Sequence, residues 1–366
     1  MATQFNKLPH WKIRLFWSLS FLCLILASIK LLDQPEPGLN FFSSSGMNDT
    51  SQKEALKFSV YHVLFDFGIR VDWITGDHHS KTVLVPADLP IVTPYTALVS
   101  RFDELGGDLI KAESNPRGDR LTMEVGLKGK SLFQVTLLRD PELRRFAGKI
   151  AIVIDDFGYS FSSLVKGFIN LDQEITLSIL PGLDYSKEIA QAGFEAKRDV
   201  MLHLPMEAKN DEVGFDGLTL RSGLSEAEIR DRVRNAVKGL PHITGLNNHM
   251  GSLATADVKL LSVMMDEVKK AGLFFLDSHT NFETRAYSVA GKNGIPCAIN
   301  DTFLDAIEEE PFIRGQVYLL AEIASRKGQA IGIGHPEKLT LKVLKEELPK
   351  LQRRGFQFVS VSELVK

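Results

Sequence analysis

Residues 150–159 read Ile-Ala-Ile-Val-Ile-Asp-Asp-Phe-Gly-Tyr, and this stretch decides the fold of the larger part of the chain. Its uninterrupted apolar beginning predicts a strand that is buried on both faces, as in a parallel sheet. Two carboxylates, Asp155 and Asp156, follow where this strand is expected to end. Asp156 alone could cap the next helix, so the pair has to be weighed together with the other strand ends.

Short apolar runs of the same kind alternate with amphipathic stretches from about residue 149 onward, which is typical of parallel strands covered by helices. The expected strands are Ile150–Ile154, Ile175–Leu180, Val200–Leu204, Gly245–Asn247, Leu273–Leu276, Pro296–Ile299, Ala330–Ile333 and Phe356–Val359. Seven or eight strands in about 220 residues is the size of a (β/α) barrel. An open doubly wound sheet is the structural alternative.

Helices between these strands have recognisable ends. Ser225, followed three residues later by Glu228, predicts a capping box. Thr255 precedes a second helical pattern. A third is expected at 341–354, where Pro349 predicts a kink.

Polar side chains gather at the expected strand ends, and the carboxyl ends of the strands carry the chemistry of (β/α) barrels. Of the nine histidines in the chain, four stand at such ends: His203, His249, His279 and His335. The acidic and amide candidates there are Asp155, Asp156, Glu207, Asn248, Asp277 and Asp301. Each has an ordinary explanation as a turn or capping residue, but their convergence on one edge predicts a functional site.

The adjacent carboxylates favour a metal site. Because successive strand residues point to opposite sides, one carboxylate is expected to bind a metal while its neighbour faces a substrate water. One carboxylate with two imidazoles is a common open ligand set for zinc and related divalent metals. Such a metal lowers the pKa of bound water and polarises a carbonyl, while a second carboxylate acts as base and a histidine protonates the leaving group.

Taken in order, several motifs resemble the divergent polysaccharide deacetylase family over about residues 147–366. These motifs are Ile-Val-Ile-Asp-Asp-Phe-Gly-Tyr, Leu-His-Leu-Pro-Met-Glu, Gly-Leu-Asn-Asn-His-Met-Gly-Ser, Phe-Phe-Leu-Asp-Ser and Ile-Gly-His-Pro. The resemblance implies an α/β fold with a distorted (β/α) barrel. It also implies kinship with metal-dependent enzymes that remove N-acetyl groups from sugar polymers.

Carried over residue by residue, the resemblance implies that Asp155 is the base and Asp156 the metal carboxylate. It implies that His203 and His249 are the imidazole ligands and that His335 is the catalytic acid. The function expected from it is a metal-dependent hydrolase that removes N-acetyl groups from an envelope or extracellular polysaccharide. The nucleophile would be metal-bound water, and zinc is the expected metal.

The second motif departs from the family pattern. Ordinary polysaccharide deacetylases pair two histidines four residues apart, whereas that spacing joins His203 to Glu207 here. Either Glu207 replaces an imidazole or His249 supplies it from the next strand, and we favour His249. The usual arginine-proline motif is absent, with Asn247-Asn248-His249 near its place. The residues expected to orient the catalytic groups or to contact substrate are Glu207, Asn248, Asp277 and Asp301.

Other functions stay open. The altered second motif also fits a non-catalytic envelope protein that keeps the barrel and binds glycan or acts as a scaffold. A glycoside hydrolase that uses Asp155 and another carboxylate is a weaker alternative. An aspartyl phosphatase is disfavoured because residues 155–158 lack the Asp-x-Asp spacing of such enzymes.

The N-terminus predicts export. Lys7, Lys12 and Arg14 precede an apolar run from Leu15 to Ile29, which is long for a signal-peptide core and short for a membrane span. No clear small-x-small cleavage site follows, so an uncleaved membrane anchor over 1–32 is favoured over a cleaved signal. The rest of the chain is expected outside the cytoplasmic membrane, anchored or periplasmic.

Between this segment and the barrel, residues 33–53 predict a polar linker, and residues 54–146 predict a small α+β domain with an antiparallel sheet. The sequence does not indicate a role for this domain. His78 and His79 beside Asp77 could bind a metal, but a solvated turn is the favoured interpretation.

The composition of the chain limits the classes of molecule that it is expected to bind. Hydrophobic residues make up 44% of the chain, enough for a packed core, and the net charge of −3 offers no global field that would attract nucleic acid. Only Cys23 and Cys297 occur, far apart, so neither a disulfide between them nor a cysteine-based zinc site is expected. The expected partners are an amino-sugar glycan and, through the N-terminus, a membrane; no protein partner is evident.

Overall fold

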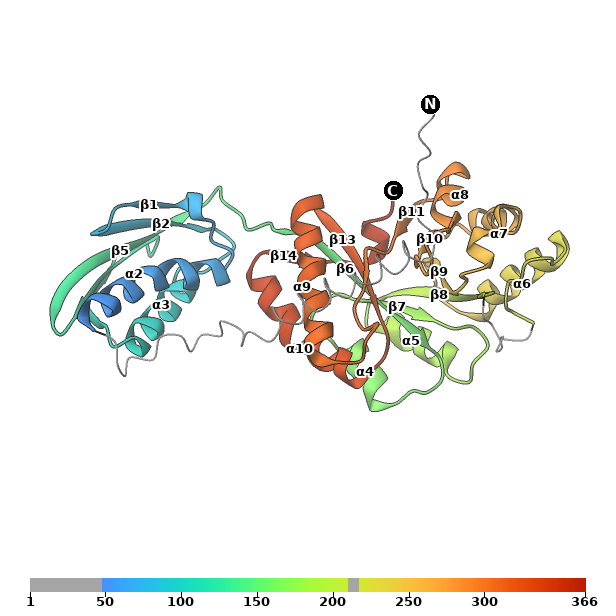
Figure 1. Ribbon diagram of the computed structural model, residues 1–366, viewed down its shortest axis with the longest axis horizontal. Helices are drawn as coiled ribbons and strands as arrows, with labels where there is room; N and C mark the ends of the chain where they lie inside the picture. The colour runs from blue at the N-terminus through green and yellow to red at the C-terminus, as the bar shows by residue number, and fades with distance from the viewer. Residues whose placement is uncertain (1–47, 210–216) are drawn as a thin grey trace, which may run out of the picture. The chain divides into compact units, whose positions relative to one another are not determined.

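The computed structural model describes residues 48–209 and 217–366 (Figure 1). The anchor or signal expected at 1–32 lies outside these residues. No helix within the two described ranges is long and apolar enough to cross a membrane. The described chain forms two compact units. The smaller contains 48–63, 74–83 and 90–139, and the larger contains Leu64–Trp73, Leu84–Leu89 and Asp140–Lys366.

The smaller unit is an α+β unit in which α2 (Asp49–Asp66) and α3 (Val92–Glu104) lie on one face of a five-stranded sheet (Figure 1). The sheet order is β1-β2-β5-β4-β3, and the pairs β1–β2, β3–β4 and β4–β5 are antiparallel. Its strands are β1 (Ile74–Gly76), β2 (Ser80–Pro86), β3 (Asp108–Ser114), β4 (Arg120–Leu127) and β5 (Lys130–Asp140).

Two sequence expectations can be compared with this unit. Of the segment 33–53 that was expected to be a linker, residues 33–47 lie outside the described residues. Helix α2 begins inside the remainder, at Asp49, where the Asn48 side chain accepts a hydrogen bond from the Ser51 backbone N–H. Asp77 accepts hydrogen bonds from the backbone N–H groups of His79 and Ser80, which makes a side-chain-stabilised turn of this loop.

The larger unit is built on a curled, all-parallel sheet with the order β11-β10-β9-β8-β7-β6-β13-β12, and β14 also pairs with β6 (Figure 1). Its strands are β6 (Gly148–Phe157), β7 (Thr176–Ile179), β8 (Asp199–Met206), β9 (Gly245–Met250), β10 (Phe274–Asp277), β11 (Cys297–Ile299), β12 (Thr302–Phe303), β13 (Gln329–Gly334) and β14 (Phe356–Phe358).

The eight expected strands are all present, and the two-residue β12 is an addition. The expectation of a barrel with seven or eight strands is therefore corrected to a nine-stranded sheet. The hydrogen-bonded path runs from β11 to β12, and no pairing in the described residues joins these two ends. The sheet is thus curled like part of a barrel and is open along its hydrogen-bonded path.

Seven helices of the described residues accompany this sheet: α4 (Ser163–Ile169), α5 (Ser186–Glu195), α6 (Glu226–Gly239), α7 (Val258–Lys270), α8 (Ala286–Lys292), α9 (Glu310–Lys327) and α10 (Lys338–Arg353). The capping box of Ser225 and Glu228 is present at the start of α6. Thr255 instead lies in a 3-10 turn, η2 (Ala254–Ala256), and Asp257 caps α7. Helix α10 begins at Lys338 and includes Pro349.

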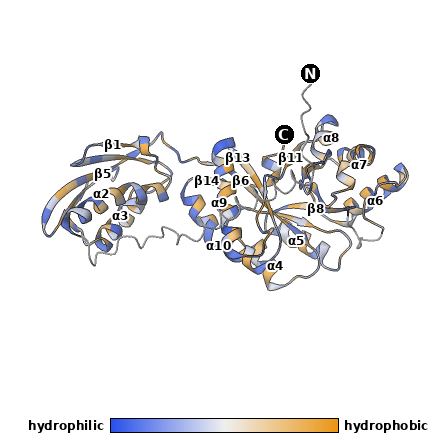
Figure 2. Cartoon of the chain, in the orientation of Figure 1, coloured by the Kyte–Doolittle hydropathy of each residue, from blue (hydrophilic) through white to orange (hydrophobic). Residues whose placement is uncertain are grey.

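Side-chain alternation along the strands separates two buried layers, and hydrophobic residues follow the strands in Figure 2. On β6, Ile152 and Ile154 pack with the helices, whereas Ala151 and Val153 face the inner side of the curl. The C-terminal turn η3 (Val361–Glu363) contributes to this inner layer. The next inward-facing position on β6 is therefore that of Asp155.

Candidate metal centre

Asp155 and Asp156 end strand β6, and both reach the same imidazole. The strand register shifts between Ile154 and Phe157, and Asp156 has a positive φ of 59°. His203 Nε2 lies 3.2 Å from Asp156 Oδ1 and 3.6 Å from Asp155 Oδ2. The expectation that these two carboxylates point opposite ways is wrong, because the bulge turns Asp156 back toward the inner side.

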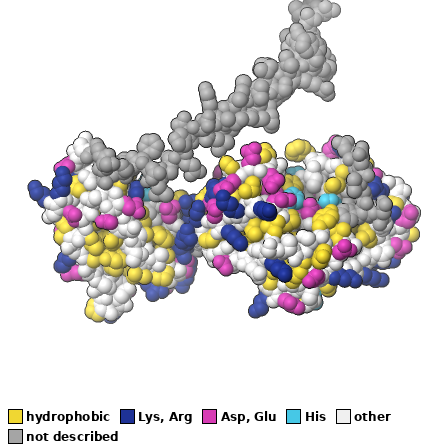
Figure 3. Space-filling model, turned by 90° about the horizontal axis from the view of Figure 1, so that it is seen from below, with side chains coloured by type: hydrophobic (Ala, Val, Ile, Leu, Met, Phe, Trp, Pro, Cys, Tyr) yellow, Lys and Arg dark blue, Asp and Glu magenta, His cyan; other side chains and the backbone are white. Residues whose placement is uncertain are grey.

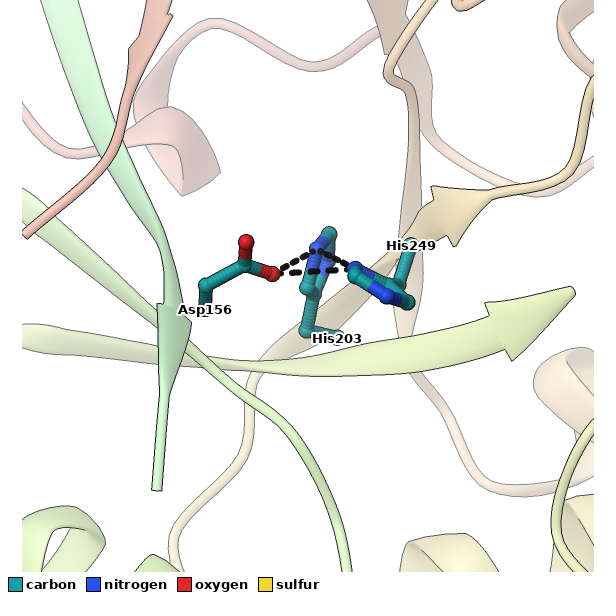
Figure 4. Close-up of side chains that lie close together, drawn as sticks. All are labelled: Asp156, His203 and His249. Carbon is teal, nitrogen blue, oxygen red and sulfur yellow. Dashed lines mark hydrogen bonds and ion pairs between the residues drawn. The ribbon is translucent and has the colours of Figure 1, made fainter. Parts of the chain in front are cut away.

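Three side chains from the C-terminal parts of β6, β8 and β9 converge: Asp156, His203 and His249 (Figure 4). His249 Nδ1 lies 2.9 Å from Asp156 Oδ1 and 3.2 Å from His203 Nε2. His203 and His249 stand on paired neighbouring strands, in which His203 is in register with Asn247 and His249 with Pro205. The sequence-predicted ligand set Asp156, His203 and His249 is thus brought together.

The geometry of these three residues fits a divalent metal. Ligand atoms held tetrahedrally at the usual zinc distances of about 2.0–2.1 Å lie about 3.3 Å from one another, close to the spacing seen here. Asp156 Oδ1 is buried and faces a ring nitrogen of each histidine. Burial raises the pKa of Asp156, but the facing imidazoles of His203 and His249 outweigh it and hold this pKa far below its ordinary value.

Asn247 holds the Asp155 carboxylate and the His203 imidazole together. Its Nδ2 donates to both oxygens of Asp155, at 2.9 and 3.1 Å, and its Oδ1 lies 2.9 Å from His203 Nδ1. Asn248, the residue proposed from the sequence, points the other way, to the backbone of Met250 and Ser278. Strand alternation could have identified Asn247, because it lies two residues before a predicted ligand.

His335 approaches the cluster from the loop after β13, the strand that pairs with β6. Its Nε2 lies 4.0 Å from Asp156 Oδ2, and its Nδ1 lies 2.8 Å from Asp305 Oδ1. Burial lowers the pKa of His335, but the Asp305 hydrogen bond and the charges of Asp305, Asp155 and Asp156 outweigh it and raise the pKa to about 9. The sequence interpretation missed Asp305, which follows the short strand β12 and carries no recognisable pattern.

Three other residues that the sequence predicted for the site make their hydrogen bonds and ion pairs outside the cluster. Asp277 accepts hydrogen bonds from the loop after β10 and from the start of α8. Its side chain has the parity of Phe275, which packs among the helices, so Asp277 faces away from the inner side. Asp301 contacts Lys327 and the backbone of Ile331. Glu207 accepts from the Ser222 backbone. The described metal-ligand group includes none of the three.

Exposed apolar side chains follow the same strand ends. Tyr159 follows β6, Met250 ends β9, and Phe282, in the loop after β10, is 99% exposed. Burial and the charge of Asp156 both raise the pKa of Tyr159, as expected for a phenol close to that carboxylate. Histidine side chains reach the molecular surface beside apolar ones in Figure 3. Ionisable side chains and exposed apolar side chains therefore lie at one edge of the sheet.

The chain is similar in sequence to proteins of Escherichia coli and Haemophilus influenzae. An uncharacterized protein of Escherichia coli strain K12, YibQ, is 35% identical over 200 residues, which cover 55% of this chain and 62% of that protein. An uncharacterized protein of Haemophilus influenzae is 36% identical over 216 residues, which cover 59% of this chain and 76% of its own length. The match thus spans less than two thirds of the E. coli relative.

The fold also has a counterpart among solved structures. The uncharacterized protein ATU2773 of Agrobacterium tumefaciens C58 superposes with a TM-score of 0.57 at 25% identity, covering 62% of this chain and 92% of that one. Residues 152–365 match the family described as divergent polysaccharide deacetylase. Because this match takes in more than half of the sequence, the chain belongs to the divergent polysaccharide deacetylase family.

Proposed function

We propose that this chain is a metal-dependent hydrolase that removes N-acetyl groups from an amino-sugar glycan of the cell envelope or its surroundings. The observation that carries the proposal is the cluster of Asp156, His203 and His249, with Asp155 and His335 beside it. The family supports a carbohydrate deacetylase in general terms. The glycan, the metal dependence and turnover by this chain are the parts that we propose.

The side chains around the cluster have complementary roles in amide hydrolysis. A divalent metal, for which zinc is our proposal, would be held by Asp156, His203 and His249 and supplies a Lewis acid for a carbonyl oxygen and for water. Asp155, held by Asn247, takes a proton from the attacking water. His335, kept protonated by Asp305, gives a proton to the leaving nitrogen. The C–N bond breaks, and acetate and an amine are the products.

The exposed apolar side chains at the strand ends support a sugar polymer as substrate. Tyr159, Met250 and Phe282 are exposed at the same sheet edge as the cluster. Exposed apolar side chains grouped at a site are typical of ligand contact, and the apolar faces of sugar rings are suited to such surfaces. We propose that these side chains contact the sugars next to the one that carries the acetyl group.

We propose further that the chain is exported and held outside the cytoplasmic membrane. The support is the apolar run of residues 15–29, which follows Lys7, Lys12 and Arg14. Alkaline phosphatase fused to the C-terminus is expected to be active in cells, because that enzyme acquires its disulfides only outside the cytoplasm. An inactive but intact fusion would overturn this address.

The function is tested with the purified full chain and oligomers of N-acetylglucosamine. Loaded with zinc, the parent is expected to release acetate and an equal amount of primary amine, and Asp155→Asn is expected to lower kcat about 10²–10⁴-fold. Full hydrolysis by Asp155→Asn on every substrate that the parent cleaves would contradict the mechanism. Binding of zinc and glycan without acetate release would favour a non-catalytic glycan-binding protein.

Metal content tests the ligand set separately. We expect about one zinc per chain in the parent and in Glu207→Ala, and loss of zinc in His203→Ala and His249→Ala. Glu207 is the matched control because it bonds the Ser222 backbone and lies outside the cluster. A parent that takes up no zinc would remove the basis of the hydrolase proposal.

A further inference from the structure

Asn247 has a buried carboxamide whose polar atoms all have partners. Nδ2 lies within 3.1 Å of both Asp155 oxygens, and Oδ1 lies 2.9 Å from His203 Nδ1. Ser178 donates its hydroxyl to the same Oδ1 at 2.6 Å. Nδ2 also donates to Ser278 Oγ at 3.2 Å. A buried network in which every group is satisfied holds its members in one arrangement.

These contacts determine which end of the amide is nitrogen. An ionised carboxylate only accepts hydrogen bonds, and both oxygens of Asp155 face the same amide atom of Asn247. That atom has to be nitrogen, because an oxygen would be repelled by both. The amide oxygen therefore faces His203.

The orientation of the amide in turn determines the tautomer of His203. An amide oxygen has no proton to give, so the proton between Asn247 Oδ1 and His203 Nδ1 belongs to the imidazole. With Nδ1 protonated, the nitrogen that can offer a lone pair is Nε2, which faces Asp156 and His249. Imidazoles that bind metals generally have the other ring nitrogen held in this way.

We propose that Asn247 is a positioning residue that sets the tautomer of His203 and the orientation of the Asp155 carboxylate at the same time. For its catalytic consequence, this inference rests on the proposed function. The amide is shared, so a change at Asn247 affects metal affinity through His203 and proton transfer through Asp155. Neither effect requires Asn247 to touch metal or substrate.

Two variants separate these effects. Asn247→Ala removes both contacts, so zinc affinity is expected to fall about 10–100-fold. Asn247→Asp keeps an acceptor for His203 Nδ1 but faces Asp155 with a second carboxylate. It is expected to keep most of the zinc affinity and to lose acetate release. The matched control is Asn248→Ala, since Asn248 is equally buried on the same strand and bonds only the backbone of Met250 and Ser278.

The readouts are zinc affinity by competition with a chelator and the position of the His203 proton by ¹⁵N NMR. The proton is expected on Nδ1 in the parent, with and without zinc, and in Asn247→Asp. A proton on Nε2 in the zinc-free parent, with Nδ1 bare, would overturn the inference. So would an Asn247→Ala variant with the zinc affinity of Asn248→Ala.

Failure of the proposed function looks different. If the parent carries its His203 proton on Nδ1 but binds no zinc, the tautomer assignment is supported and the hydrolase proposal fails. If the parent binds zinc and Asn247→Ala does not, yet no glycan is hydrolysed, the positioning role is supported for a metal-binding protein without turnover.

Discussion

Backbone conformation at single residues shapes the edge of the sheet that carries the cluster. Asp156, Met250 and His279 all have positive φ, between 55° and 59°, and each stands where a strand ends. The left-handed conformation costs a residue with a Cβ roughly 1–2 kcal/mol. At Asp156 this cost accompanies a functional gain, because the same turn of the backbone brings its carboxylate to His203 and His249.

The strain at Asp156 predicts that a glycine variant is more stable than an alanine variant at this position, which is the reverse of the usual order. With zinc removed, Asp156→Gly is expected to be more stable than Asp156→Ala by about 1 kcal/mol, because glycine adopts positive φ freely. Both variants lose the Asp156 carboxylate, so the difference between their stabilities reports the backbone alone. Urea unfolding of the two zinc-free proteins measures it. An alanine variant as stable as the glycine variant would show that Asp156 is unstrained.

Between elements, helices α6 and α7 are joined by a charged cluster centred on Glu267. This α7 carboxylate is 5% exposed and accepts hydrogen bonds from Arg230 and Arg234 on α6 and from Lys270 on its own helix. The Arg234 hydrogen bond lowers the pKa of Glu267 most, against the opposing effect of burial, and with Lys270 and Arg230 brings it to about 2.

This lowered pKa predicts that the free energy of unfolding falls as the pH is lowered. The folded value lies below the ordinary value of 4.5, so the stabilisation is complete above pH 4.5 and is lost as pH falls through about 2. Glu267→Gln should therefore lose less stability than the parent between pH 5 and pH 2, by about 1–3 kcal/mol after allowance for the partly exposed arginines. Denaturant unfolding at several pH values measures the difference. Parallel pH curves would contradict the assignment.

The loop between β10 and α8 is firmly held, yet it exposes a phenylalanine. Asp277 anchors the loop through three hydrogen bonds, and Thr280 donates to the carbonyl of Met250, the residue after His249. Phe282 stands in this loop with 99% of its surface exposed. An ordered loop that presents an apolar ring at the same edge of the sheet as the cluster is suited to contact with a ligand.

Phe282→Ala is expected to raise KM for N-acetylglucosamine oligomers several-fold with little change in kcat, because the ring contributes binding area and takes no part in proton transfer. The matched control is Phe194→Ala. Phe194 is also exposed, but it lies on α5 and stacks on His242, near the opposite ends of the strands. Steady-state kinetics on oligomers of increasing length measure the effect. Equal KM values for the two variants would exclude Phe282 from substrate contact.

At the scale of the whole molecule, the cluster draws on strands that are far apart in sequence. Asp156, His203 and His249 come from β6, β8 and β9, and His335 follows β13. A metal bound there would connect these strands and would bind only the folded chain, so it would stabilise the larger unit by mass action. None of the described residues of the smaller unit belongs to the cluster.

Zinc is therefore expected to stabilise the two units unequally. At about 100 times the dissociation constant, zinc should add about 2.7 kcal/mol to the free energy of unfolding of the larger unit. Hydrogen exchange should slow in β6, β8 and β9 and stay unchanged in β1, β3 and β4, which lie wholly in the smaller unit. His249→Ala is expected to abolish the zinc effect, and Glu207→Ala to retain it. Equal protection of both units by zinc would contradict a site confined to the larger one.

Much of this arrangement follows from local sequence patterns. Apolar runs predicted eight of the nine strands of the larger sheet, and the capping box at Ser225 predicted the start of α6. These patterns are informative because burial on both faces and helix capping depend on residues that are close in sequence. Strand ends marked by His203, His249 and His335 indicated the site for the same reason, since parallel strands end at one edge.

Only the tertiary structure decided which polar residues face one another. Asp155, His203, Asn247 and His249 share the inward parity of their strands, whereas Asn248 and Asp277 have the opposite parity and bond elsewhere. Asp305, which follows β12, bonds His335, and β12 is too short to leave a pattern in the sequence. The bulge at Asp156 breaks the alternation that the sequence predicts, because the register between β6 and β7 is set by pairing across the sheet.

The sequence by itself thus determined where the strands lie, that they are parallel, and which polar residue types stand near their ends. It could do so because hydrophobic periodicity is a local property. The tertiary structure decided the open curl of the sheet, the turn of Asp156 and the partners Asn247 and Asp305. These depend on strand register and on contacts between residues distant in the chain, which no local pattern encodes.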